Sequence, residues 1–142
     1  MINDKHLEVG ISMTPSVPVN FWYDAKIYKE ILFNLIQNAV KFNNQDGVIN
    51  VKISFDPETS LLNTEITDSG AGINKEKQKS LFYAFRGIST QRNQSMTKNK
   101  EDRSGIGIGL SNAKILCEAM GGSISLKSAP GKGTVVNFSV DV

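Results

Sequence analysis

Four polar side chains recur at helical spacing in residues 30–42, EILFNLIQNAVKF: Glu30, Asn34, Asn38 and Lys41. At about 100° per residue they share one narrow stripe, opposite a broad apolar arc. A stripe that only meets water usually carries stronger helix formers than two asparagines. Amide oxygens suit a hard cation, and an ammonium suits a phosphate. The stripe indicates a cation and phosphate site, with a solvated helix face as the alternative.

A second candidate group is the carboxylate of Asp68, at the end of the predicted strand LLNTEITD. The two-residue period of a strand places Asp68 on the same face as Leu62 and Ile66, which is the core face. An aspartate that only starts the following turn is the alternative. Gly70 and Gly72 follow, where the backbone can approach a flat ligand without a Cβ in the way.

Residues 86–104 form a long polar stretch with five basic and two acidic side chains. A loop of this length in a compact domain is commonly functional, and its charge suits a polyphosphate, although a merely solvated loop is the alternative. Gly105, Gly107 and Gly109 then lead into an apolar helix that ends at Gly121, and a helix N-terminus attracts anions. A dinucleotide-binding turn needs a strand directly before its glycines, whereas a polar loop precedes these. The chain also lacks a P-loop, because GKGT near the C-terminus has neither a GKS or GKT sequence nor the upstream glycine.

The elements that position these groups alternate in type along the chain. Strands are predicted at HLEVGISM, VINVKISF, LLNTEITD, SISLKS and TVVNFSV, and helices from Asp24 to about Phe42, over NKEKQKSLFYAF and after the glycines. This order predicts an α/β (α+β) two-layer sandwich: one mixed, mostly antiparallel sheet with about three helices on one face. Residues 1–142 are expected to form a single domain, with a lid at about 86–106.

Composition excludes several classes of function. The net charge of +2 is too small to indicate a nucleic acid or an anionic membrane as partner. The single cysteine, Cys117, cannot form an internal disulfide, and with the single histidine, His6, it cannot build a zinc site. No segment is long and apolar enough to span a bilayer. We therefore expect a cytoplasmic protein, or the cytosolic portion of a membrane-bound receptor.

Four motifs in a fixed order carry a family resemblance over nearly the whole chain. NLIQNAVKF resembles an N box, DSGAGI a G1 box, LFYAF an F box and SGIGIGL a G2 box, and the final strands also match. The sequence resembles the ATP-binding catalytic domain of sensor histidine kinases, the Bergerat-fold HATPase domain of the GHKL superfamily. The resemblance implies ATP and Mg²⁺ as cofactors and transfer of the γ-phosphate to a histidine.

The resemblance also implies roles for individual residues. Asp68 would accept a hydrogen bond from the adenine amino group, Asn38 would hold Mg²⁺ with help from Asn34 or Glu30, and Lys41 would touch a phosphate. The catalytic set would be Asn34, Asn38 and Lys41. The implied nucleotide-binding set is Asn34, Asn38, Lys41, Phe42, Asp68, Gly70, Gly72, Ile73, Phe85, Arg86, Gly105, Ile106, Gly107, Ile108, Gly109, Leu110 and Thr134.

Asn34 stands where ATPases of this superfamily place a glutamate base. An amide cannot accept a proton near neutral pH, whereas a neutral imidazole needs little activation, so this position favours a histidine acceptor. The phosphoacceptor hairpin of the family does not occur here, and His6 heads a strand. We therefore expect the acceptor on a separate dimerisation domain, a response regulator downstream, and a monomeric isolated domain. A degenerate nucleotide-binding module and a superfamily ATPase are the alternatives.

Overall fold

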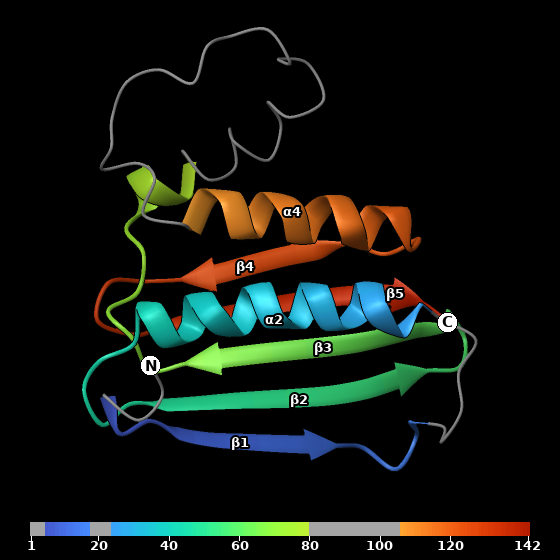
Figure 1. Cartoon of the computed structure of the whole chain (residues 1–142), viewed down its shortest axis with the longest axis horizontal. Helices are drawn as coiled ribbons and strands as arrows, with labels where there is room; N and C mark the ends of the chain where they lie inside the picture. The colour runs from blue at the N-terminus through green and yellow to red at the C-terminus, as the bar shows by residue number, and fades with distance from the viewer. Residues whose placement is uncertain (1–4, 18–23, 80–105) are drawn as a thin grey trace, which may run out of the picture.

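The computed structural model describes residues 5–17, 24–79 and 106–142, with residues 106–109 described in their backbone only. Two helices lie on one face of a five-stranded sheet (Figure 1). The strands are β1 (Glu8–Met13), β2 (Val48–Asp56), β3 (Leu61–Asp68), β4 (Ile124–Ser128) and β5 (Thr134–Asp141). The helices are α2 (Ala25–Lys41) and α4 (Ile106–Ala119), and residues 75–79 form a further helical turn.

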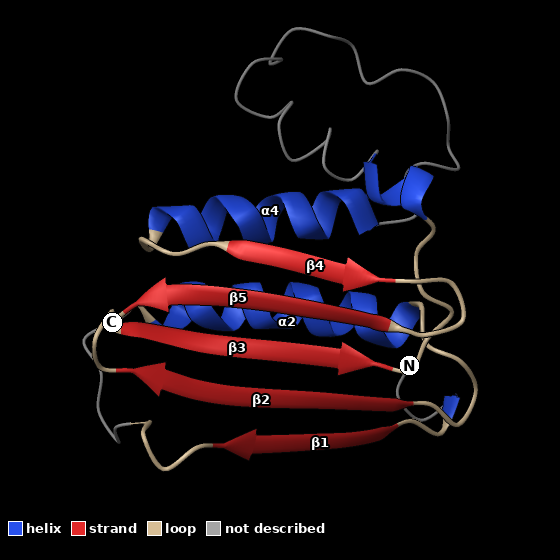
Figure 2. Cartoon of the chain, turned by 180° about the vertical axis from the view of Figure 1, so that it is seen from behind, coloured by secondary structure: helices blue, strands red, loops and turns tan. Residues whose placement is uncertain are grey.

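The sheet is mixed, in the order β1-β2-β3-β5-β4. Only β1 and β2 are parallel, because α2 is the crossover between them, and the other three pairs are antiparallel. Seen from behind, the strands lie in front of α2, and α4 lies along the β4 edge of the sheet (Figure 2). The predicted two-layer sandwich is confirmed.

Helix α2 begins and ends with specific hydrogen bonds. Asp24 is the N-cap, as predicted, and its Oδ1 accepts from the backbone N–H groups of Lys26 and Ile27 at 3.0 and 3.2 Å. At the other end Lys5 Nζ donates to three carbonyl oxygens, those of Val40, Lys41 and Asn43, at 2.8 to 3.1 Å. An ammonium beside the last carbonyls of a helix is favourable, since these carry the negative end of the dipole.

The core lies between α2, α4 and the sheet. Its fully buried members include Ile31, Ile49, Ile66, Cys117 and Phe138. The buried hydroxyls of Tyr28 and Thr64 are hydrogen-bonded at 2.8 Å, which satisfies both groups away from water. Cys117 is a buried thiol, and burial raises its pKa to about 12.

The structure differs from the sequence prediction at the start of α4. The helix begins at Ile106 and includes Gly107 and Gly109, which were expected to precede it. Several predictions fall outside the described residues: the basic lid up to residue 105, the aromatic end of the helix predicted over NKEKQKSLFYAF, Phe85, Arg86 and Gly105. None of the described helices is long and apolar enough to cross a membrane.

Candidate functional site

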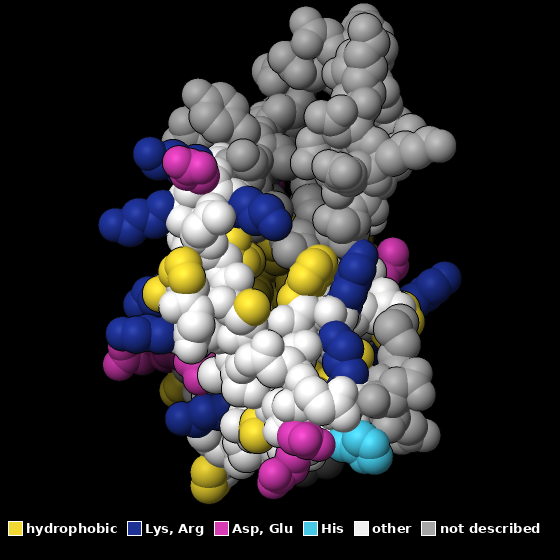
Figure 3. Space-filling model, turned by 90° about the vertical axis from the view of Figure 1, so that its left-hand side faces the viewer, with side chains coloured by type: hydrophobic (Ala, Val, Ile, Leu, Met, Phe, Trp, Pro, Cys, Tyr) yellow, Lys and Arg dark blue, Asp and Glu magenta, His cyan; other side chains and the backbone are white. Residues whose placement is uncertain are grey.

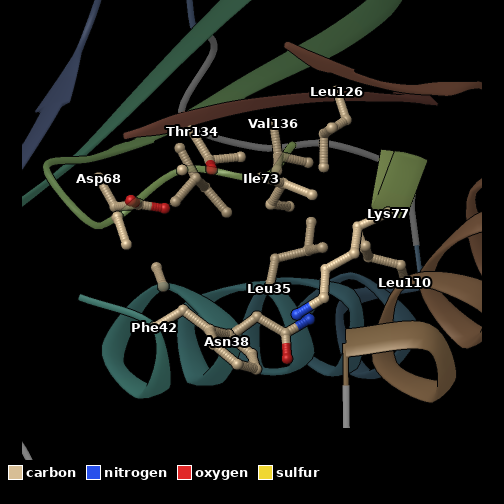
Figure 4. A pocket seen from close by; sticks show the side chains of 14 residues that line it. Leu35, Asn38, Phe42, Asp68, Ile73, Lys77, Leu110, Leu126, Thr134 and Val136 are labelled. Carbon is tan, nitrogen blue, oxygen red and sulfur yellow. The ribbon is translucent and has the colours of Figure 1, made fainter. Parts of the chain in front are cut away.

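A cavity of about 230 Å³ lies between α2 and the sheet, where β3 ends and β5 begins. It opens on the side of the molecule shown in Figure 3, where apolar side chains lie in a hollow and basic side chains surround it. The residues that line it are Leu35, Asn38, Ala39, Phe42, Ile66, Asp68, Ala71, Gly72, Ile73, Lys77, Leu110, Leu126, Thr134 and Val136. Most are apolar, and the few polar groups come from separate elements (Figure 4).

Asp68 is placed in this cavity by the register of the sheet. It is the last residue of β3 and pairs with Ile49 of β2 on one side and Thr134 of β5 on the other. Its face is the one that carries the buried Ile66, so the carboxylate points toward the helices, as the two-residue period predicts. Asp68 therefore both lines the cavity and starts the following turn, because its Oδ1 accepts from the backbone N–H of Gly70.

Two features of its surroundings shift the pKa of the Asp68 carboxyl in opposite directions. Burial raises its pKa above the ordinary value, and backbone hydrogen bonds from Gly70 and Thr134 oppose that rise. The bond from Gly70 N to Oδ1 measures 2.8 Å. Oδ1 thus already accepts a hydrogen bond from the protein's own backbone. A ligand donor would have to bind the remaining lone pairs of the carboxylate.

Glycines bring the loop after β3 close to its neighbours. Gly72 has φ +75°, and a Cβ there would collide with the carbonyl of Ala129. Gly70 is buried against the end of α2, where a Cβ would collide with the carbonyl of Phe42. Gly72 therefore forms part of the cavity wall, while Gly70 lies beneath it and allows the loop to approach α2.

Asn38 lies toward the opposite end of the cavity from Asp68 (Figure 4). Its Nδ2 is buried and has no hydrogen-bond partner within the described residues. An unsatisfied buried amide is costly, so this group is the expected place for a ligand acceptor. The side chain of Lys77 extends toward Asn38 across the cavity, which brings a cation to the same end.

The structure brings together seven of the residues expected to bind nucleotide: Asn38, Phe42, Asp68, Gly72, Ile73, Leu110 and Thr134. Asn34 is half-buried, and Glu30 and Lys41 are exposed. These three are not among the lining residues of the described cavity, and Lys41 Nζ lies 5.3 Å from the ring centroid of Phe42 instead. Their roles stay predictions.

Sequence reasoning missed Lys77 and much of the apolar wall, including Leu35, Leu126 and Val136. Leu126 and Val136 pair across the β4–β5 hairpin and could have been found from its alternation. Lys77 gives no such signal, because it is one of three lysines in NKEKQK and only the fold shows which one faces the cavity.

A family model described as histidine kinase-, DNA gyrase B- and HSP90-like ATPase matches residues 23–142. The chain belongs to this family. This HATPase-family chain is 36% identical over 141 residues to hybrid signal transduction histidine kinase B of Dictyostelium discoideum, covering 98% of the chain and 7% of that protein. It is 31% identical over 136 residues to aerobic respiration control sensor protein ArcB of Escherichia coli, covering 96% of this chain and 16% of that protein.

Solved structures confirm the fold of the HATPase-family chain. Full-length ShkA in complex with AMPPNP aligns with a TM-score of 0.73 and 22% identity, over 98% of this chain and 26% of that one. The catalytic domain of histidine kinase ThkA aligns with a TM-score of 0.71 and 20% identity, over 99% and 82%. The chain spans no more than about a quarter of the length of the curated relatives that it matches.

Proposed function

We propose that this domain binds Mg-ATP in the cavity and transfers the γ-phosphate to a histidine on a separate phosphoacceptor domain, in two-component signalling. The observation that carries the proposal is the pairing of a half-buried carboxylate, Asp68, with the buried Asn38 Nδ2, which has no partner among the described residues, at the two ends of one apolar cavity. Such a cavity fits a ligand with an apolar, flat end that donates a hydrogen bond and a polar end that accepts one.

The Asp68 end fits adenine. The exocyclic amino group of adenine is a hydrogen-bond donor, whereas guanine presents a carbonyl oxygen at the equivalent position, which a carboxylate would repel. The apolar side chains of Ile73, Val136 and Leu126 supply flat walls for the ring. The proposal therefore predicts discrimination between ADP and GDP at this one group.

The Asn38 end fits phosphates and a hard cation. The Oδ1 of Asn38 is an oxygen ligand of the kind that Mg²⁺ prefers. Its Nδ2 has no acceptor within the described part of the chain and would donate to a phosphate oxygen. Groups of three or more His, Cys, Asp or Glu residues that could hold a metal are absent from the described part of the chain. This agrees with a cation that arrives with the nucleotide, because Mg²⁺ at phosphates needs only one or two protein ligands. When bound, Mg²⁺ would neutralise charge on the phosphates.

The chain's own residues would act mainly by positioning. Phosphoryl transfer depends on alignment and charge neutralisation more than on covalent chemistry by the protein. Asp68 would fix the purine, Asn38 and Lys77 would fix the phosphates, and the N-terminal turn of α4, one turn before Leu110, would add backbone N–H groups. Asn34 cannot act as a base for water, which favours an imidazole as acceptor.

The acceptor would lie on another domain or protein. His6 is the only histidine in the chain and lies exposed before β1, outside the cavity lining. A histidine-containing dimerisation domain of a parent kinase is the proposed partner, and a response regulator would receive the phosphate afterwards. A cytoplasmic location, and residues 1–142 as a single catalytic domain, belong to the same proposal.

Two experiments test the proposal in sequence. Titration calorimetry with ADP and GDP, each with and without Mg²⁺, is expected to show that ADP binds and GDP does not. Mg²⁺ should raise the affinity for ADP. Incubation with ATP and a phosphoacceptor domain from a parent kinase is then expected to give acid-labile phosphohistidine. A domain that binds ADP but never transfers would be a nucleotide-binding module, and one that rapidly hydrolyses ATP by itself would be an ATPase.

A further inference from the structure

The end of α2 and the loop after β3 are joined by the side chain of Asn43. This residue is only 6% exposed. Its Oδ1 accepts from the backbone N–H of Asn44 at 2.9 Å and from the hydroxyl of Ser69 at 3.2 Å, and its Nδ2 donates to the carbonyl of Val48 at 3.2 Å. Both ends of the buried amide are therefore hydrogen-bonded, to the adjacent Asn44, to the start of β2 and to the residue after β3.

Ser69 completes the connection from the other side. Its Oγ accepts from Val48 N at 2.8 Å, its backbone N–H donates to Val48 O at 3.1 Å, and its carbonyl accepts from Asn44 Nδ2 at 3.0 Å. The carbonyl of Asn43 is also held, by Lys5 Nζ at 3.1 Å. We call the hydrogen bonds among Asn43, Asn44, Val48 and Ser69 the Asn43–Ser69 bridge.

The bridge is made by residues that are next in sequence to the cavity lining. Neither Asn43 nor Ser69 lines the cavity, but each follows a residue that does, Phe42 and Asp68. Asn38 lies one turn before Phe42 on the same helix, so the bridge connects the element that carries Asn38 to the residue after Asp68. Relative movement of α2 and the β3 loop would change the separation between these two groups.

We infer that Asn43 and Ser69 are positioning residues that hold Asp68 and Asn38 at the separation one nucleotide spans. The inference rests on the proposed function, because it assumes a ligand that contacts both ends of the cavity. Such a ligand gains affinity when its two contacts are held at a fixed distance, since the second contact then costs little additional ordering. A ligand that reaches only the Asp68 end gains nothing from the bridge.

Ser69→Ala is the informative variant, with Ser69→Thr as its matched control. Ser69 is exposed, so its replacement should not prevent folding. Alanine removes the acceptor for Val48 N and the donor to Asn43 Oδ1, whereas threonine keeps a hydroxyl. We expect ADP to bind Ser69→Ala about 3- to 10-fold more weakly, because its two contacts are no longer held at a fixed distance. Adenosine affinity should change less than about twofold, and Ser69→Thr should bind both ligands as the unmodified domain does.

A second variant uses a different member of the bridge. Asn44 is exposed, and Asn44→Ala removes the bond to the carbonyl of Ser69, so it should shift the ADP to adenosine affinity ratio in the same direction. Amide hydrogen exchange should also quicken at Val48 in Ser69→Ala, which reports the bridge without any ligand.

The outcomes separate this inference from the proposed function. Equal weakening of ADP and adenosine in Ser69→Ala, or no change in either, would overturn the positioning role while leaving nucleotide binding intact. Failure of the unmodified domain to bind ADP would refute the proposed function, and the inference with it. If Ser69→Ala loses affinity for ADP but not for adenosine, and Ser69→Thr loses neither, both the positioning role and the proposed function are supported.

Discussion

Replacing Asp68 by asparagine should remove most of the affinity for adenine nucleotides. A carboxylate has two acceptor oxygens, and Gly70 N already uses Oδ1 at 2.8 Å. Asparagine has only one acceptor oxygen, so either Gly70 N–H or the adenine amino group would face the NH₂ group of the variant. Whichever way the amide turns, one donor meets another.

The magnitude follows from the kind of bond that is lost. A hydrogen bond to a charged group contributes about 1.5–3 kcal/mol, which corresponds to a loss of about 10- to 100-fold in ADP affinity. Isothermal titration calorimetry measures this directly, and circular dichroism with thermal unfolding checks that the variant is folded. Asp141→Asn is the matched control, because Asp141 is an exposed residue of the same sheet, paired with Leu61 at the end of β3 far from Asp68.

The ADP affinity of the control variant and the GDP affinity of Asp68→Asn show whether Asp68 binds the base. Asp141→Asn should bind ADP like the unmodified domain. If Asp68→Asn kept its full affinity for ADP, the adenine would lie elsewhere and the orientation proposed for the ligand would be wrong. If it gained affinity for GDP, the carboxylate would be confirmed as the group that selects the base.

Four further predictions test other parts of the structure. Adenosine affinity should decline as the pH falls through the pKa of Asp68, which is raised above the ordinary value of 3.8, because the ionised carboxylate is the better acceptor. Calorimetry on Asp68→Asn should no longer show this pH dependence. Lys77→Ala should weaken ADP binding about 3- to 10-fold at low salt without affecting adenosine, whereas Lys79→Ala on the same helical turn should change neither. Asn38→Leu should abolish the difference between ADP affinities measured with and without Mg²⁺. Lys5→Met should lower the free energy of unfolding, measured by urea denaturation, by about 1–2 kcal/mol, because three carbonyls at the end of α2 lose their donor. Lys52→Met, on the exposed face of β2, should leave this free energy unchanged.

The sequence predicted the parts of the site that depend on local periodicity. The inward direction of Asp68 follows from alternation in β3. The helical period of α2 placed Asn38 on one stripe with Glu30, Asn34 and Lys41, but of these four only Asn38 is among the lining residues of the described cavity. The contributions of Lys5, Ser69 and Lys77 could not be predicted, since each depends on which segments the fold brings together: Lys5 contacts residues 35 to 38 positions away. The start of α4 was misplaced because glycine has a low helix propensity, which the rest of the helix overrides at Gly107 and Gly109.

The placement of Asp68 by strand register limits how this domain can change length during evolution. Its neighbours on both sides are fixed, Ile49 in β2 and Thr134 in β5. Deletion of one residue within β3 would turn the carboxylate to the opposite face of the sheet, beside Glu65 and away from the helices. Insertion in the exposed turn at 57–60 would leave it in place. A turn of this domain can therefore change length without moving Asp68, whereas β3 cannot gain or lose a single residue without turning the carboxylate away from the cavity.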